Sequence, residues 1–460
     1  MAKILNTFNN HDDRLSMTLV VRVIYLAILL FSFPLTSHAS NLSVLSWKEH
    51  TNLNSSGKIS EILAQGRVKN LPANKLLNAF SIGFGPQRDI KITDVICDGK
   101  EVEHNFVNHV LTIKFPNAKS SNDAFSIYFA YEEKYGKVDT FLREEMINIP
   151  DFAAGADSEI IISFPGYLES VTLNPNLTKV DNQFIYRKKV PVEGVQELIK
   201  LTPSQNVWDV SVKATIIANQ GLTNATVFMP TYFQNGGQKV ENSNITSSTI
   251  PIKQSLEAGT NKLKFNTPNR TTIIASKARI STGKNNRSQI LRNPSDYLAV
   301  MDDEAALLSP ILDRIQSNPK YQGFPLYAKI GKYVNNFIRY DTKYTGKLPS
   351  ITQLLQNPVG VCSEYASLFN ALARLAKIPS ISVEGAACGN GDKCMGHAWN
   401  MIYYDNKWIE VDPTWDLMSG VVSSSHVYFN DSGKGGVTVQ YFDAKESVAP
   451  LVDFDMKSVL

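Results

Sequence analysis

The chain has 460 residues, of which 43% are hydrophobic and 19% are charged, and its formal net charge at pH 7 is +3. A chain of this length is expected to form two or three domains. The nearly balanced charge, without a basic patch interleaved with aromatic residues, argues against a nucleic-acid-binding protein. Four cysteines in so long a chain exclude a disulfide-dense scaffold.

The first 39 residues have the features of a secretory signal peptide. Residues 23–33 form an apolar core, and Ser37-His38-Ala39 matches a small-x-small cleavage signature. The core is shorter than the about 20 apolar residues that span a bilayer. Residues 19–21 would lengthen it into an uncleaved membrane anchor if Arg22 extended its charged end to the interface. We expect a cleaved signal over residues 1–39, a secreted or periplasmic protein, and no stable membrane span after cleavage; anchoring is the alternative.

Residues 40–290 carry the alternating apolar and polar pattern of half-buried strands. Clear examples are 89–96, 110–115, 125–131 and 209–216. Turn signals such as Asp98-Gly99 separate these runs. The regular spacing of short strands and turns predicts one or two sandwich-like domains. If there are two, Thr202-Pro203-Ser204 is the candidate boundary.

After about residue 290 the apolar spacing changes to the 3.6-residue period of helices. One helix is expected over residues 297–308, and Pro310 predicts the first turn of a separate helix that ends at Ser317. A further helix is expected over residues 326–340. The sequence therefore predicts a change of fold class near residue 290, from β-rich to mixed α and β.

Cys362 lies at the expected start of another helix. The side chains at 365, 369, 372 and 376 form an apolar stripe that packs this helix on its domain core, and Lys377-Ile378-Pro379 ends it. Unpaired N–H groups and the helix dipole at such a position lower the pKa of a thiol and can stabilise an oxyanion. Taken alone, Cys362 would be read as an inert core cysteine, the usual role of a lone cysteine, so its partners decide its role.

His397 and Asp412 lie on two runs, residues 397–404 and 408–412, that predict a β-hairpin. If Asp405-Asn406 is a two-residue turn, the imidazole and the carboxylate come within one diagonal step on the same sheet face. A carboxylate there can hold the tautomer of the imidazole and stabilise its charged form. A slip of one residue would move Asp412 to the other face.

Cys362, His397 and Asp412 together form a predicted catalytic triad with a thiolate nucleophile. Their motifs, G-V-C-S-E-Y-A, G-H-A-W-N and W-I-E-V-D-P-T-W, resemble those of the transglutaminase-like superfamily, over roughly residues 300–430. The resemblance implies a papain-like α+β catalytic domain, which we expect over residues 291–460. It also implies that Cys362 is the nucleophile, His397 the general base and acid, and Asp412 its orienter. Trp399 and Trp415 are expected to pack beside the site.

Cys388 and Cys394 bracket a short polar loop that can bring the two sulfurs together. In an exported protein this favours a disulfide. Two unrelated loop thiols, or a metal site, are the alternatives. The Cys-x5-Cys spacing is unfavourable for metal, and His397 is the one imidazole nearby. No acidic cluster has calcium-loop spacing. The sequence therefore predicts no metal and no cofactor.

The resemblance implies chemistry through a thioester intermediate, because the superfamily includes protein cross-linkers, amide hydrolases and peptidases. We therefore expect an exported thiol-dependent amide hydrolase or acyltransferase, of protease, deamidase or transglutaminase type, that acts on proteins or peptides. The alternative is a non-catalytic module that binds protein or glycan through the same fold. The sequence leaves open the choice between hydrolysis and transfer, the substrate and the oligomeric state.

Overall fold

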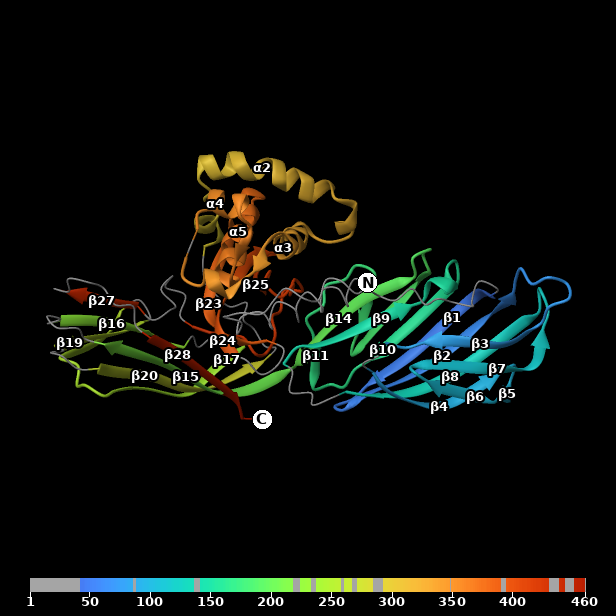
Figure 1. The fold of residues 1–460 in the computed structure, drawn as a ribbon. Coiled ribbons are helices and arrows are strands. Elements are labelled where there is room, and N and C mark those ends of the chain that lie inside the picture. The colour runs from blue at the N-terminus through green and yellow to red at the C-terminus, as the bar shows by residue number, and fades with distance from the viewer. Residues whose placement is uncertain are drawn as a thin grey trace, which may run out of the picture.

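The computed structural model describes residues 42–459 apart from several short segments. These are 86–87, 136–140, 218–223, 233–236, 258–259, 267–270, 284–292, 348, 390–393, 430–437 and 443–450. The expected signal segment, residues 1–39, lies outside the described residues. Figure 1 shows two β-rich parts lying end to end, with the helices above the place where they meet. We call the parts β unit 1, β unit 2 and the α/β core.

β unit 1 contains one large sheet and two small ones. The large sheet has the order β12-β13-β10-β1-β2-β8-β4-β5, and the small sheets are β11-β14-β9 and β3-β7-β6. The strands are β1 Leu42–Leu53, β2 Gly57–Val68, β3 Leu77–Gly83, β4 Asp89–Cys97, β5 Lys100–Glu101, β6 His104–Val107, β7 Val110–Lys119, β8 Ala124–Lys134, β9 Arg143–Ile149, β10 Asp157–Ser163, β11 Leu168–Ser170, β12 Thr178–Val180, β13 Gln183–Lys189 and β14 Val195–Pro203. Their inward side chains, Trp47 and Phe129 among them, form one buried cluster. The predicted period-2 alternation is thus what builds this core.

β unit 2 is a sandwich of two four-stranded sheets, ordered β17-β20-β15-β28 and β18-β19-β16-β27. Its strands are β15 Gln205–Ile217, β16 Asn224–Pro230, β17 Gln238–Ser247, β18 Lys253–Glu257, β19 Thr260–Asn266, β20 Thr271–Gly283, β27 Thr438–Phe442 and β28 Leu451–Ser458. The chain passes from β unit 1 to β unit 2 at Ser204, between β14 and β15. The inward faces bury a second apolar cluster that includes Trp208 and Phe265.

The C-terminal strands belong to β unit 2 and not to the α/β core. β27 pairs with β16, and β28 pairs with β15, both antiparallel. From the sequence we expect one domain over residues 291–460. In the structure the α/β core ends before residue 438, where β27 begins. The pairing partners lie far upstream in the sequence, so no local pattern indicates which sheet these two strands join.

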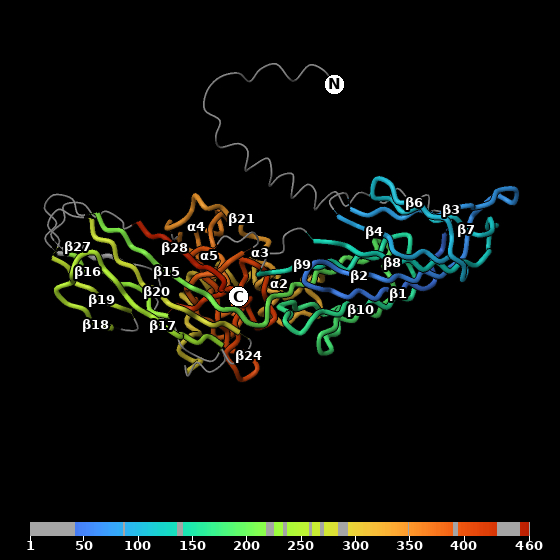
Figure 2. The backbone as a smooth tube through the Cα atoms, turned by 90° about the horizontal axis from the view of Figure 1, so that it is seen from below, coloured from blue at the N-terminus to red at the C-terminus, as the bar shows by residue number. Residues whose placement is uncertain are grey.

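The α/β core packs four helices against a small antiparallel sheet ordered β25-β24-β23-β26. Its elements are α2 Asp302–Ser317, α3 Leu326–Phe337, β21 Arg339–Tyr340, α4 Ile351–Gln356, β22 Val359–Gly360, α5 Cys362–Leu375, β23 Ser380–Cys388, β24 Cys394–Tyr404, β25 Lys407–Val411 and β26 Val427–Tyr428. Figure 2, seen from below, places this core between the two β units. The predicted fold class, a β-rich region followed by an α+β domain, is confirmed.

The predicted break at Pro310 is wrong, because α2 runs through it without interruption. Residues 294–297 form a separate short 3₁₀ turn, so the helix expected over 297–308 begins later, at Asp302. Proline removes one intrahelical hydrogen bond, but Pro310 lies on the exposed side of α2. The opposite side buries Leu308, Ile311, Leu312 and Ile315. Burial of that stripe outweighs the lost bond.

Among the residues that the structure describes, no helix combines the length and the apolar character that crossing a bilayer requires.

Candidate active site

Cys362 is the first residue of α5, directly after the short strand β22. The entry into the helix is fixed by Glu364, whose Oε2 accepts the N–H of Val361 at 2.7 Å. Glycine is required at Gly360, because a methyl group there would lie 2.6 Å from Cβ of Glu364. The first N–H groups of α5 have no acceptor within the helix and surround the thiol with partial positive charge. Cys362 is half-buried, whereas the other free cysteine, Cys97, is buried in β4.

The hairpin that carries His397 has the predicted register. Tyr404 pairs with Lys407, and the ladder continues to the pair of Asn400 and Val411. Asp405 and Asn406 adopt φ values of 51° and 59°, the left-handed conformation that a two-residue turn of type I′ requires. The turn residues therefore set which face of the sheet receives each side chain.

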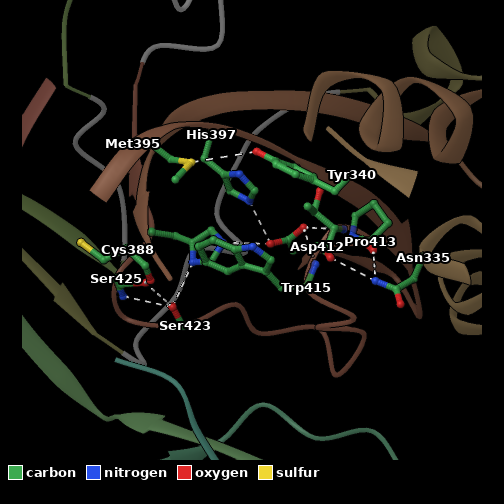
Figure 3. Close-up of polar contacts among 12 residues, drawn as sticks. Asn335, Tyr340, Cys388, Met395, His397, Asp412, Pro413, Trp415, Ser423 and Ser425 are labelled. Carbon is green, nitrogen blue, oxygen red and sulfur yellow. Dashed lines mark hydrogen bonds and ion pairs between the residues drawn. The ribbon is translucent and has the colours of Figure 1, made fainter. Parts of the chain in front are cut away.

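His397 and Asp412 are hydrogen-bonded, with Nε2 of the histidine 2.9 Å from Oδ2 of the aspartate. Both side chains are buried. The second carboxylate oxygen, Oδ1, accepts the backbone N–H groups of Thr414 at 2.8 Å and Trp415 at 3.4 Å. Figure 3 shows the imidazole directed at this carboxylate. The carboxylate is thus held from both sides, which fixes the direction of its bond to His397.

The charges at the site stabilise one another. Burial alone would lower the pKa of His397, but the charge and hydrogen bond of Asp412, together with the hydrogen bond and charge of Cys362, raise it to about 10. Burial alone would raise the pKa of Asp412, but His397 and His426 hold it well below its usual range. With Nε2 engaged by the aspartate, Nδ1 is the imidazole nitrogen left for the thiol. The structure therefore places His397 in a hydrogen bond with Asp412 and in electrostatic interaction with Cys362.

Two tryptophans hold the imidazole plane. The ring of Trp415 stacks on that of His397 with centroids 4.5 Å apart and planes 15° apart. Trp399 is nearly parallel to the imidazole at 5.9 Å and is fully buried. The expected packing role of both tryptophans is thus observed. They restrict rotation of the ring and keep water from the bond between the histidine and the aspartate.

His426 is a further residue of this site, and the sequence alone does not indicate it. Its Nε2 lies 3.3 Å from Oδ2 of Asp412, and its Nδ1 lies 3.1 Å from Oγ of Ser423. The side chain is fully buried. It follows a run of three serines in an irregular segment just before β26, so no periodicity or motif singles it out. The structure alone connects it to the triad.

The predicted disulfide is present between Cys388 and Cys394. It joins the last residue of β23 to the first residue of β24, which face each other in the ladder. Close by, the hydroxyl of Tyr340 points at the sulfur of Met395, 4.0 Å away, and Met395 is 40% exposed. Figure 3 shows this contact on one side of His397. The disulfide therefore restrains the strand end that leads into the catalytic histidine candidate.

A metal ion would compete with the triad arrangement. Within the described residues, His397, Asp412 and His426 bring potential ligand atoms within 4.8 Å of one another. However, Oδ2 of Asp412 already interacts with both imidazoles, and its Oδ1 accepts two backbone N–H groups. A metal bound here would replace the hydrogen bond between Nε2 of His397 and Asp412. We therefore assign the group to a hydrogen-bonded network.

The buried pair gives stability a defined pH dependence. Because the pKa of His397 rises from 6.5 to about 10 on folding, its contribution is complete below pH 6.5 and is lost as the pH rises to about 10. The pKa of Asp412 is lowered on folding, so the contribution of Asp412 to stability is lost as the pH falls into the acid range and is complete at neutral pH. We expect the urea midpoint to fall more steeply between pH 7 and 10 in the wild type than in His397→Gln. An equally steep fall of the urea midpoint in both proteins would contradict an ion pair between His397 and Asp412.

Comparison with known proteins gives a match over the α/β core. Residues 313–413, which include Cys362, His397 and Asp412, match the transglutaminase-like superfamily model. The kyphoscoliosis peptidase of Mus musculus is 32% identical over 81 residues, and that of Homo sapiens is 34% identical over 80 residues. Each match covers 16% of this chain and 12% of the relative, so the chain spans about an eighth of these proteins.

Two solved structures show a more distant likeness. A chain from Cytophaga hutchinsonii, provisionally assigned as a cysteine protease, is 17% identical, with a TM-score of 0.43. That alignment covers 55% of this chain and 91% of the other. Leukotriene A4 hydrolase from Saccharomyces cerevisiae is 11% identical, with a TM-score of 0.26, over 38% of this chain and 31% of the other.

Proposed function

We propose, on the premise that residues 313–413 carry a transglutaminase-like core, that this protein is a thiol-dependent amide hydrolase or acyltransferase acting on proteins or peptides. The observation that carries the proposal is the imidazole of His397, held by Asp412 at 2.9 Å and interacting with Cys362 at the start of α5. A thiol, an imidazole and a carboxylate in this order are what an activated thiolate requires.

The first step forms a thioester. The thiolate of Cys362 attacks the amide carbonyl carbon, and the carbonyl π electrons move to the oxygen. The developing oxyanion faces the N–H groups at the start of α5. Collapse of this intermediate breaks the C–N bond, and the imidazolium of His397 gives its proton to the leaving amine. Asp412 remains ionised throughout and stabilises the imidazolium.

The second step releases the acyl group. A water molecule or a primary amine attacks the thioester while His397 takes up its proton, and the C–S bond breaks to return the thiolate. Water gives hydrolysis, and an amine gives transfer. A fluorescent primary amine added to a peptide-substrate assay distinguishes the two, because only transfer incorporates the amine into the product.

We also propose that this chemistry takes place outside the cytoplasm. The signal-like segment of residues 1–39 supports export. The disulfide between Cys388 and Cys394 gives further support, since such bonds persist mainly in oxidising compartments.

Labelling with iodoacetamide at neutral pH tests the activated thiolate. We expect rapid labelling of Cys362 in the wild type, none at that position in Cys362→Ala, and a rate lowered by about 100-fold in His397→Ala, because the imidazolium that stabilises the thiolate is gone. Cys97→Ala is the matched control, since Cys97 is a free but buried cysteine. Its rate should equal that of the wild type. Labelling that is unchanged in His397→Ala would refute the thiolate and favour a non-catalytic binding module.

A further inference from the structure

We propose that His426 is a positioning residue of this site: it holds the carboxylate of Asp412 in place, and the two β units hold His426. This inference rests on the proposed function, because it concerns the orientation of the aspartate that orients His397. It also gives the β-rich region a role, since neither β unit contributes a residue to the triad itself.

The hydrogen bonds of His426 suit a fixed donor to the carboxylate. Nε2 lies 3.3 Å from Oδ2 of Asp412, the same oxygen that interacts with His397. If Nε2 donates there, Nδ1 of a neutral ring is an acceptor, and the hydroxyl of Ser423 lies 3.1 Å from it. Oδ2 thus has a donor on each side, and the carboxylate cannot swing away from His397 without breaking its bond to His426.

Aromatic contacts fix the ring of His426 as tightly as its hydrogen bonds do. Its edge meets Trp399 and Trp415, each with centroids 5.0 Å away and planes 84° and 75° apart. These are the same two tryptophans that lie parallel to His397. The two histidines and two tryptophans therefore pack as one unit around Asp412, in which Trp415 is half-buried and the other three are buried.

The segment that carries His426 is bound by both β units through Ser424. Its backbone N–H donates to the hydroxyl of Thr202 in β14, at 3.2 Å. Its carbonyl accepts the indole N–H of Trp208 in β15, at 3.0 Å, and the hydroxyl of Thr282 in β20. Three strands from two β units thus meet at the backbone of a residue two positions before His426.

Further contacts extend this hold beyond Ser424. The side-chain amide of Gln238 in β17 bonds both the N–H and the carbonyl of Tyr428, each at 2.7 Å. Val427 and Phe429 pack in the apolar cluster of β unit 2. From β unit 1, the ammonium of Lys200 donates to the carbonyl of Trp415 at 2.7 Å. The β units therefore fix both His426 and the tryptophan that stacks on His397.

Two substitutions at His426 separate the hydrogen bond from the packing. His426→Phe keeps a planar ring but removes the donor, whereas His426→Gln keeps an N–H that can reach the carboxylate. Because a hydrogen bond to a charged group is involved, we expect the iodoacetamide labelling rate of Cys362 to fall about 10–100-fold in His426→Phe. In His426→Gln it should stay within about 3-fold of the wild type. Equal rates in all three proteins, or an equal loss in both variants, would overturn the proposal.

A second pair of variants tests the role of the β units without touching the site. Thr202→Val removes the hydroxyl that binds Ser424, and Thr51→Val removes a buried hydroxyl of β unit 1 that binds Ser60 at 2.7 Å. We expect slower labelling of Cys362 in Thr202→Val and an unchanged rate in Thr51→Val. Equal labelling rates in the two variants would overturn the role of the β units. This test does not depend on whether His426→Phe folds.

The outcomes separate this inference from the proposed function. If the labelling rate of Cys362 does not depend on His397, the proposed activated thiolate is refuted and the inference falls with it. Labelling that depends on His397 but not on His426 keeps the proposed function and overturns the inference alone.

Discussion

Replacing Asp412 by asparagine is expected to lower the turnover of peptide amides by about 10⁴-fold with the fold intact. Oδ1 accepts two backbone N–H groups, and Oδ2 interacts with His397 and His426. An asparagine has one acceptor oxygen, which the two N–H groups will retain, so its NH2 group faces the imidazoles. Nε2 of His397 must then accept a hydrogen bond, which puts the ring proton on Nδ1, the side of the thiol. In that tautomer His397 cannot take up a proton from a nucleophile.

Asp416→Asn is the matched control for this experiment. Asp416 lies four positions further along the same segment and binds Lys332 at 2.9 Å in a partly exposed ion pair. Such a pair contributes little, and it does not touch the imidazole. We expect its turnover to stay within about 3-fold of the wild type. Comparable losses in the two variants would show that the effect comes from the segment and not from the carboxylate.

Replacing Trp208 by alanine is expected to lower the free energy of unfolding by about 3–5 kcal/mol and to slow the labelling of Cys362 as well. Its side chain is fully buried, and its ring lies 4.6 Å from that of Phe141. The substitution leaves a large cavity in β unit 2. It also removes the indole N–H that binds the carbonyl of Ser424 at 3.0 Å, so the segment before His426 loses one of its anchors. Urea unfolding and iodoacetamide labelling measure the two effects separately.

Trp47→Ala distinguishes lost stability from lost positioning. Trp47 is 2% exposed in the core of β unit 1, where its ring lies 6.1 Å from that of Phe152, so its removal should cost a similar free energy of unfolding. It belongs to the buried cluster of β unit 1, whereas Val427 and Phe429, next to His426, belong to the cluster of β unit 2. We expect its labelling rate to match the wild type under native conditions. If both tryptophan variants slow labelling equally, global destabilisation explains the effect.

The parts of the site that sequence could predict are those set by local chemistry. Cys362 lies two residues after Gly360, which the tight entry into α5 requires, and its helix shows the 3.6-residue period. Asp405 and Asn406 readily adopt positive φ, and a two-residue turn leaves one register for the hairpin. The positions of His397 and Asp412 follow from that register, so a short stretch of sequence determined their proximity.

The parts that sequence could not predict depend on contacts between distant segments. His426 lies in an irregular segment whose place is set by strands of both β units, through Thr202, Trp208 and Gln238. Strands β27 and β28 show an ordinary strand pattern that does not indicate the sheet they join. The uninterrupted helix α2 is a different case, because tertiary burial overrode the preference of Pro310 for a helix start.

The return of β27 and β28 to β unit 2 also constrains when the site can become ordered during synthesis. These strands are made after the whole α/β core, yet β28 covers the edge of β15, the strand that carries Trp208. A nascent chain that has just completed the core therefore presents Cys362 and His397 while β unit 2 still has open strand edges. Ordering of the candidate site is then coupled to the closing of a sandwich whose strands β27 and β28 are made after the core.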